Sequence, residues 1–377
     1  MVEQALRSTA LEAIHESLGA TFTDFAGWRM PVRYGSDLAE HAAVRERAGL
    51  FDLSHMGEIH VQGPQAGQAL DNALAGKLSA ISVGRAKYSL LLTEEGGVID
   101  DVITYRLAEE HYLVVANAAN AEIDAQEITA RAEGFDARVE DASDRTALIA
   151  VQGPRSQEIL LRVLAGAETG IEGIAAEDLT EMKYYRVAQG TYRGRQLLVA
   201  RTGYTGEDGF ELYVPADLAA PLWEQLTVAG GEDLTPCGLA CRDTLRLEAG
   251  MPLYGHELGR DLHPAQSGMG RVVALSTKDD FVGRAGVENT DVSSRPVLVG
   301  LVAEGRRAAR AGSSVRTADG VEVGSVTSGA LSPTLGHPIA MALVRPDLTE
   351  AGTELVVDVR GKPLPVRVVE LPFYSRR

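Results

Sequence analysis

The chain has 377 residues, of which 45% are hydrophobic and 24% are charged, a composition typical of a globular protein with a large core. No apolar run approaches the roughly 20 residues that a membrane-spanning helix needs. The formal net charge is −17 and no concentrated basic patch interrupts it, so we expect neither nucleic-acid nor membrane binding.

The N-terminal region predicts one helix and one aromatic segment. Apolar residues spaced three and four apart predict a helix over residues 5–18. Residues 22–32 follow, with Phe25 and Trp28 around Gly27, and could serve as core packing or as a pocket wall. Acidic residues near the N-terminus argue against a secretory or transit peptide, so we expect a cytoplasmic protein.

A strand, a glycine-proline turn and a helix occur twice in the sequence. Residues 59–64 (IHVQGP) and residues 149–154 (IAVQGP) each lead into an expected helix with proline at its first position. We infer two related α+β units, about residues 1–140 and 141–285. Packing about a pseudo-twofold axis would make the two acidic segments described next face each other. The alternative is that local turn chemistry alone produces the two similar strings.

The first acidic segment, residues 96–101 (GGVIDD), turns the chain between two expected strands, residues 88–92 and 98–105. Because side chains alternate along a strand, Asp101 falls in the more apolar row and Asp100 in the more polar one. Burial would raise the pKa of Asp101 and let it hold or relay a proton near neutral pH. The alternative is a structural acid that caps the hairpin or pairs with an arginine.

The second acidic segment, residues 201–211 (RTGYTGEDGFE), has glycine at every third position of a turn. It lacks the lysine of a phosphate loop and the spacing of a dinucleotide-binding turn. On the following strand Phe210 and Leu212 point to one side and Glu211 points to the other. A carboxylate there suits the paired N–H donors of an aminopyrimidine ring. The alternative is an exposed strand acid.

A further helix is expected over residues 236–249, with Thr235 as its N-cap and Gly250 past its end. Cys237 and Cys241 lie four residues apart on it. Two cysteines without further ligands do not make a structural zinc site, so we expect buried thiols in a reducing compartment.

From residue 297 the pattern changes to short apolar runs separated by turns that contain Gly, Pro or Asp. This pattern predicts a small β-barrel, which we expect to form a separate C-terminal domain over residues 290–377.

Patterns for common catalytic centres are missing from the sequence. There is no serine elbow, no metal-binding His-Glu-x-x-His string and no evident cysteine–histidine pair. His55 lies in a dense polar motif, but we expect a satisfied structural histidine rather than a base. We therefore expect no metal site.

Several strings together resemble one family, the folate-dependent aminomethyltransferases, or T-proteins, of the glycine cleavage system. They occur in order along nearly the whole chain: residues 24–31 (DFAGWRMP), 51–58 (FDLSHMGE), 96–101, 201–211, 242–248 (RDTLRLE) and 327–336 (TSGALSPTLG).

The resemblance implies an α+β fold in which three domains form a cloverleaf, two related α+β units and a C-terminal β-barrel, around a central folate channel. It also implies a reaction. A lipoylated carrier, the H-protein, presents an aminomethyl group, and tetrahydrofolate as co-substrate accepts its carbon. The products are 5,10-methylenetetrahydrofolate, ammonia and dihydrolipoyl H-protein. We expect a monomer or a weak oligomer.

The resemblance further assigns site residues. Asp101 corresponds to the family's catalytic aspartate, and Glu211 and Arg242 correspond to its folate-contacting acid and arginine. Five more residues match folate-pocket positions: Met56, Tyr88, Tyr105, Tyr185 and Tyr204.

Two other functions fit a similar fold. One is a folate-dependent demethylase of a methylated small molecule; related domains fused to amine oxidases accept carbon from an oxidised amine. The other is a non-catalytic, folate-binding assembly factor for iron–sulfur proteins. Those factors carry a Lys-Gly-Cys motif that this chain lacks, since Cys237 follows a proline.

Overall fold

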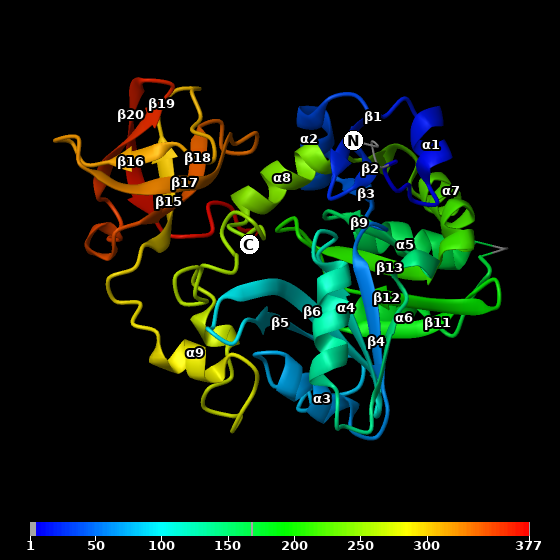
Figure 1. Ribbon diagram of the computed structural model, residues 1–377. Coiled ribbons are helices and arrows are strands. Elements are labelled where there is room, and N and C mark those ends of the chain that lie inside the picture. The colour runs from blue at the N-terminus through cyan, green and yellow to red at the C-terminus, as the bar shows by residue number, and fades with distance from the viewer. Residues whose placement is uncertain (1–4, 167–168, 377) are drawn as a thin grey trace. The chain divides into compact units, whose positions relative to one another are not determined.

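The computed structural model describes residues 5–166 and 169–376 (Figure 1). They form two compact units that exchange segments along the chain. The first unit holds the residues up to Leu70, Leu78–Lys87 and Val102–Arg242, and the second holds Asp71–Lys77, Tyr88–Asp101 and the residues from Asp243 onward. Within the described ranges no helix is both long and apolar enough to cross a membrane. The division into domains near residues 140 and 285 stays a prediction.

The first unit begins with a short helix and a β-hairpin: α1 (Glu12–Ser17), β1 (Thr21–Phe25) and β2 (Trp28–Arg33). The helix expected over residues 5–18 is therefore wrong in its first half. Arg7 instead forms a backbone bridge with Trp28, and its guanidinium lies 3.9 Å from the centroid of the Trp28 ring. Hydrogen bonding to the hairpin replaces the helical pattern at this point.

A seven-stranded sheet lies at the centre of the first unit, in the order β10-β11-β12-β13-β9-β3-β14. Its strands are β3 (Ala48–Asp52), β9 (Thr146–Gln152), β10 (Ile171–Glu172), β11 (Val187–Tyr192), β12 (Arg195–Ala200), β13 (Gly209–Pro215) and β14 (Leu234–Pro236). Helices in this region are α2 (Asp37–Glu46), α5 (Ser156–Ala165), α6 (Ala176–Glu181) and α7 (Ala219–Gly230). Alternate side chains of β13, including Phe210 and Leu212, pack with Trp223 of α7 in the main hydrophobic core.

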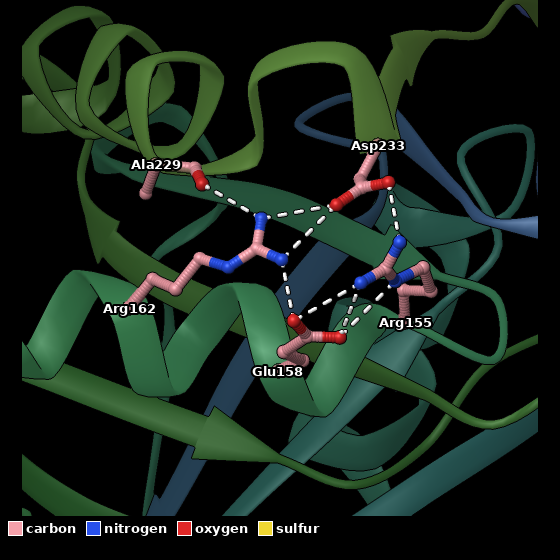
Figure 2. Close-up of polar contacts among 5 residues, drawn as sticks. All are labelled: Arg155, Glu158, Arg162, Ala229 and Asp233. Atoms are coloured by element: carbon pink, nitrogen blue, oxygen red, sulfur yellow. Dashed lines mark hydrogen bonds and ion pairs between the residues drawn. The ribbon is translucent and has the colours of Figure 1, made fainter.

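A surface ion network ties α5 to the segment that follows α7, as Figure 2 shows. Asp233 accepts from Arg155 at 2.7 Å and from Arg162 at 3.1 Å, and Glu158 pairs with the same two arginines. The Arg162 guanidinium also donates to the carbonyl oxygen of Ala229 at 3.4 Å. These contacts hold two helices together on the same side of the sheet.

A five-stranded sheet has the order β5-β6-β7-β4-β8. Its strands are β4 (Gly57–Gln62), β5 (Arg85–Leu92), β6 (Val98–Ala108), β7 (His111–Ala116) and β8 (Arg138–Asp141), and the nearby helices are α3 (Ala66–Ala73) and α4 (Ala121–Arg131). The repeated strings have matching backbones, because Gly63 and Gly153 both adopt φ = +133°. A Cβ atom at either glycine would lie 2.5 Å from a carbonyl oxygen, so only glycine fits. Pro64 and Pro154 lie in the turns before α3 and α5, not at the first helical position.

Helix α8 covers Leu239–Glu248 and starts later than expected. Thr235 is not its N-cap, because β14 pairs in parallel with β3 and holds Thr235 in an extended strand. The helix ends as expected before Gly250. Cys237 and Cys241 are both buried free thiols, as predicted, although Cys237 precedes the helix.

The second unit contains α9 (Arg284–Asn289) and a closed six-stranded barrel in the order β15-β18-β17-β16-β19-β20 (Figure 1). Its strands are β15 (Val297–Ala303), β16 (Ser314–Arg316), β17 (Glu322–Leu331), β18 (Pro338–Val344), β19 (Glu354–Val359) and β20 (Lys362–Val369). The predicted mixed α+β fold with a C-terminal barrel is confirmed. Short 3₁₀ helices complete the chain: η1 (Ser143–Arg145), η2 (Ala216–Leu218), η3 (Gly231–Asp233), η4 (Gly270–Val272) and η5 (Pro346–Leu348).

Candidate functional site

Glu211 is the centre of a buried polar cluster in the first unit. It lies on the face of β13 opposite the main core, but it is only 9% exposed, so the alternative of an exposed strand acid is wrong. Its Oε2 atom accepts a hydrogen bond from Thr202 Oγ1 at 2.5 Å and one from the Tyr105 hydroxyl at 3.4 Å. Tyr105 also contacts the Tyr213 hydroxyl at 3.3 Å. We call these four residues the Glu211 cluster.

The environment of Glu211 favours proton retention. Burial raises the pKa of the Glu211 carboxyl, and the hydroxyls of Thr202 and Tyr105 and the charge of Arg242 offset only part of that rise. Among the described residues, no side chain or amide donates to the second oxygen, Oε1. Glu211 therefore keeps one acceptor for a ligand.

Arg242 supplies the positive charge nearest to the cluster. It lies on α8, and its guanidinium is 4.9 Å from the centroid of the Tyr204 ring. Burial lowers the pKa of Arg242, and the charge of Glu211 opposes that shift. Within the described residues the guanidinium makes no hydrogen bond, so its donors can serve an acidic group on a ligand.

Two more predicted pocket residues lie in the first unit. Tyr185 adopts a left-handed φ of +62°, and burial together with the charge of Glu211 raises the pKa of its hydroxyl. Met56 is half-buried in the turn after β3. No hydrogen bond or ring contact in the described chain joins Met56 to the Glu211 cluster. The structure therefore associates Tyr105, Tyr185 and Arg242 with Glu211.

The turn that carries the second acidic segment is held by ion pairs. Arg45 donates to Glu207 at 3.0 Å and to the Thr205 carbonyl at 2.7 Å, and Arg201 pairs with Asp208 at 2.6 Å. Glu207 and Asp208 are thus structural acids, in contrast to Glu211. Sequence reasoning missed the supporting residues, because nothing in the pattern shows that Arg45 reaches this turn.

Asp101 belongs to the second unit. The Tyr88 hydroxyl donates to Asp101 Oδ2 at 3.0 Å, so two predicted pocket residues are in direct contact. The expected placement of the two aspartates is wrong. Asp100 is fully buried, and Asp101 is only half-buried. The row of β6 that contains Val98 and Asp100 faces the interior, and Asp101 faces the more open side. A half-buried carboxylate with one phenol donor can still accept a proton.

His55 is buried, as expected for a structural histidine, but it is not satisfied. Its ring packs edge-on against Phe25, with centroids 5.4 Å apart. Its Nδ1 atom has no hydrogen-bond partner in the described part of the chain. Burial, with a contribution from the charge of Arg242, lowers the pKa of His55 to about 4 against the opposing charge of Asp52. The ring is therefore neutral at physiological pH.

Comparisons with known proteins identify the family. The model of the GCVT N-terminal domain matches residues 11–277, and that of the glycine cleavage T-protein C-terminal barrel domain matches residues 297–375. An aminomethyltransferase from Cutibacterium acnes is 64% identical over 371 residues, covering 98% of this chain and 99% of its own. One from Streptomyces coelicolor is 55% identical over 383 residues, covering 100% of both chains.

A crystal structure of the glycine cleavage system aminomethyltransferase T from Bartonella henselae has the same fold. It matches with a TM-score of 0.90 and 36% identity, covering 99% of each chain. The two family models together, and each of these relatives alone, span nearly the whole sequence. The chain therefore belongs to the glycine cleavage T-protein family of aminomethyltransferases.

Proposed function

We propose that the chain transfers the aminomethyl carbon of lipoylated H-protein to tetrahydrofolate. The carbon leaves its sulfur and its amine and becomes the methylene bridge between two folate nitrogens. The sulfur returns as a thiol and the amine leaves as ammonia. The observation that carries the proposal is Glu211, a buried carboxylate with one oxygen available to a ligand and Arg242 nearby. The relatives named aminomethyltransferase support it.

Glu211 is proposed to hold the pterin ring. The aminopyrimidine edge of a pterin presents adjacent N–H donors, and Oε1 of Glu211 is an acceptor without a protein donor. Thr202 and Tyr105 fix the other oxygen and so orient the carboxylate. Arg242 would pair with an acidic group of the ligand or balance the charge of Glu211.

Asp101 is proposed as the catalytic acid–base group. The attacking folate nitrogen must lose a proton and the departing amine must gain one. A half-buried carboxylate held by the Tyr88 hydroxyl can orient the nitrogen and handle that proton. Folate supplies the nucleophile, so the protein mainly positions the reactants and excludes water. The remaining proposed folate-pocket residues are Met56, Tyr88, Tyr105, Tyr185 and Tyr204.

One assay separates the candidate functions. We expect tetrahydrofolate-dependent ammonia release from aminomethylated H-protein, with 5,10-methylenetetrahydrofolate as the second product. Release of a carbon from methylated glycine derivatives, without activity on H-protein, would favour the demethylase. Folate binding without either turnover would favour the assembly factor. The cytoplasmic location and the monomeric or weakly oligomeric state remain predictions.

A further inference from the structure

A polar cavity lies within the first unit and has a volume of about 270 Å³. Its walls come from β4, from β12 and β13, and from the segment around η1. Glu58 and His60 project from the same face of β4, and Leu198 and Tyr213 line the cavity from the seven-stranded sheet. Of the Glu211 cluster, only Tyr213 contributes to it.

Glu58 is the unusual residue of this cavity. Its side chain is fully buried, and neither carboxyl oxygen has a hydrogen-bond partner in the described part of the chain. A buried acid without a partner destabilises the fold, and an apolar side chain at this position would make the fold more stable. Its neighbours Ile59 and Val61 point to the opposite face and are also fully buried. An acid at this position therefore indicates a partner that enters the cavity.

Two arginines line the outer part of the same cavity. The side chains of Arg145 and Arg195 are 58% and 55% exposed, whereas Glu58 is buried, so the lining of the cavity changes from exposed arginines to a buried acid. Each guanidinium is paired with a surface acid, Glu140 for Arg145 and Asp217 for Arg195. Such exposed pairs contribute little and can yield to a competing anion.

We propose that this cavity binds a small amino acid, with its ammonium group on Glu58 and its carboxylate on Arg145 and Arg195. An anion without an amine would leave Glu58 unpaired, and a cation without a carboxylate would meet two guanidinium groups at the entrance. A zwitterion satisfies both ends. The volume of the cavity is close to the lower end of the range typical of small-molecule sites.

Ligand binding should release a proton. Burial, with a contribution from the charge of Asp141, raises the pKa of Glu58 well above its ordinary value, so the empty cavity favours the neutral acid. An entering ammonium group favours the carboxylate and drives the proton out. His60 contacts His111 at 2.8 Å, and burial lowers the pKa of His60 to about 4, so neither gain nor loss of a proton is expected there. The charged or titratable groups around Glu58 are His60, Glu140, Asp141, Arg145, Arg195 and Tyr213.

Calorimetric titration of the full chain with glycine and L-serine tests this site. Folate should be present at saturation, so that amino-acid binding at the proposed folate site is excluded. We expect millimolar binding with about one proton released per ligand near neutral pH, measured in two buffers of different ionisation enthalpy. Methylamine and acetate, which carry only one of the two charges, should each bind more weakly.

Glu58→Gln should weaken binding by about tenfold or more and abolish proton release. Its thermal midpoint should equal or exceed that of the wild type, because the amide cannot ionise. Glu110→Gln, a change of an exposed acid between β6 and β7, is the matched control and should bind like the wild type. Arg195→Ala should weaken L-serine binding without weakening methylamine binding, and this surface variant keeps the test valid if Glu58→Gln fails to fold.

Three results would overturn the proposal. The first is no binding of either amino acid at tens of millimolar concentration. The second is binding that neither Glu58→Gln nor Arg195→Ala weakens. The third is a crystal soaked with L-serine that holds only water beside Glu58. None of these results bears on transfer to folate, which is assayed separately by ammonia release.

Discussion

Glu211 and Asp101 are both acids on strands that follow glycine-containing turns, yet their surroundings differ. Glu211 is 9% exposed and has two hydroxyl donors on one oxygen and an arginine nearby, whereas Asp101 is half-buried and accepts a hydrogen bond from the Tyr88 hydroxyl. A tightly held carboxylate suits anchoring, because its direction is fixed. A more exposed carboxylate suits proton transfer, because a reacting group can reach it. Local packing, not residue type, thus separates the two proposed roles.

The largest expected effect is that of Asp101→Asn on turnover. The amide keeps the shape and removes the proton acceptor, so kcat should fall by about 10²–10⁴-fold. The folate dissociation constant and the urea midpoint should change little. Steady-state ammonia release and a denaturant titration measure these quantities. Asp100→Asn is not a suitable control because Asp100 is buried, and Glu95→Gln in the same hairpin turn, at an exposed position, serves instead.

A third acid, Asp52, sharpens the comparison because its role is structural. Burial would raise the pKa of Asp52, but hydrogen bonds from His15 at 2.9 Å and Thr9 at 2.6 Å outweigh it, and the pKa is lowered. Ionised Asp52 therefore stabilises the fold at pH values above the pKa that this aspartate has in the unfolded chain. The stabilisation is lost as the pH falls through the lower pKa that it has in the folded protein.

Asp52→Asn should lower the free energy of unfolding by about 2–4 kcal/mol at pH 7. The difference from the wild type should shrink below about pH 4, where the unfolded aspartate is protonated. Urea unfolding at several pH values measures both. A stability loss that stays constant down to pH 3 would contradict the assignment.

Glu211→Ala should act on binding more than on chemistry. Loss of the proposed pterin acceptor should raise the folate dissociation constant by about 10–100-fold, while kcat at saturating folate falls by a smaller factor. Calorimetry and initial rates measure the two. Glu211→Gln offers a matched test, because its carbonyl oxygen can still accept from Thr202 but carries no charge. An unchanged dissociation constant in both variants would remove Glu211 from the folate site.

Tyr88→Phe should give the smallest effect. It removes one hydrogen bond to the ionised form of Asp101, so the pKa of that carboxyl should rise. We expect a decrease in kcat of about three- to tenfold, with the acidic limb of the pH–rate profile shifted to higher pH. A lower kcat with no shift of that limb would indicate a packing role only.

Much of this molecule could be predicted from the pattern of its residues. Short apolar runs separated by turns predicted a C-terminal β-barrel, and the closed barrel of β15 to β20 confirms it. The hairpin around Gly96 was also predicted from its pair of glycines. The φ of +84° at Gly96 explains why the turn has glycine there. The spacing of apolar residues did not reveal that Arg7 bridges to the β1–β2 hairpin, or that Thr235 belongs to a strand of the seven-stranded sheet.

The site shows the same limit. Strand alternation correctly put Glu211 and Phe210 on opposite faces of the strand. It could not show that Glu211 would be buried against Thr202 and Tyr105. For Asp100 and Asp101 the alternation was correct and the choice of the inner face was wrong, because packing of the whole sheet decides that choice. The same reasoning missed Glu58, whose burial depends on a second sheet far along the chain.

The most direct test of the account is the single-turnover rate of ammonia release from aminomethylated H-protein at saturating tetrahydrofolate, compared among the wild type, Asp101→Asn and Glu211→Ala. The account predicts a rate reduced by about 10²–10⁴-fold in Asp101→Asn and by a much smaller factor in Glu211→Ala. A wild-type rate in Asp101→Asn would contradict the account. So would a loss of rate in Glu211→Ala that is larger than the loss in Asp101→Asn.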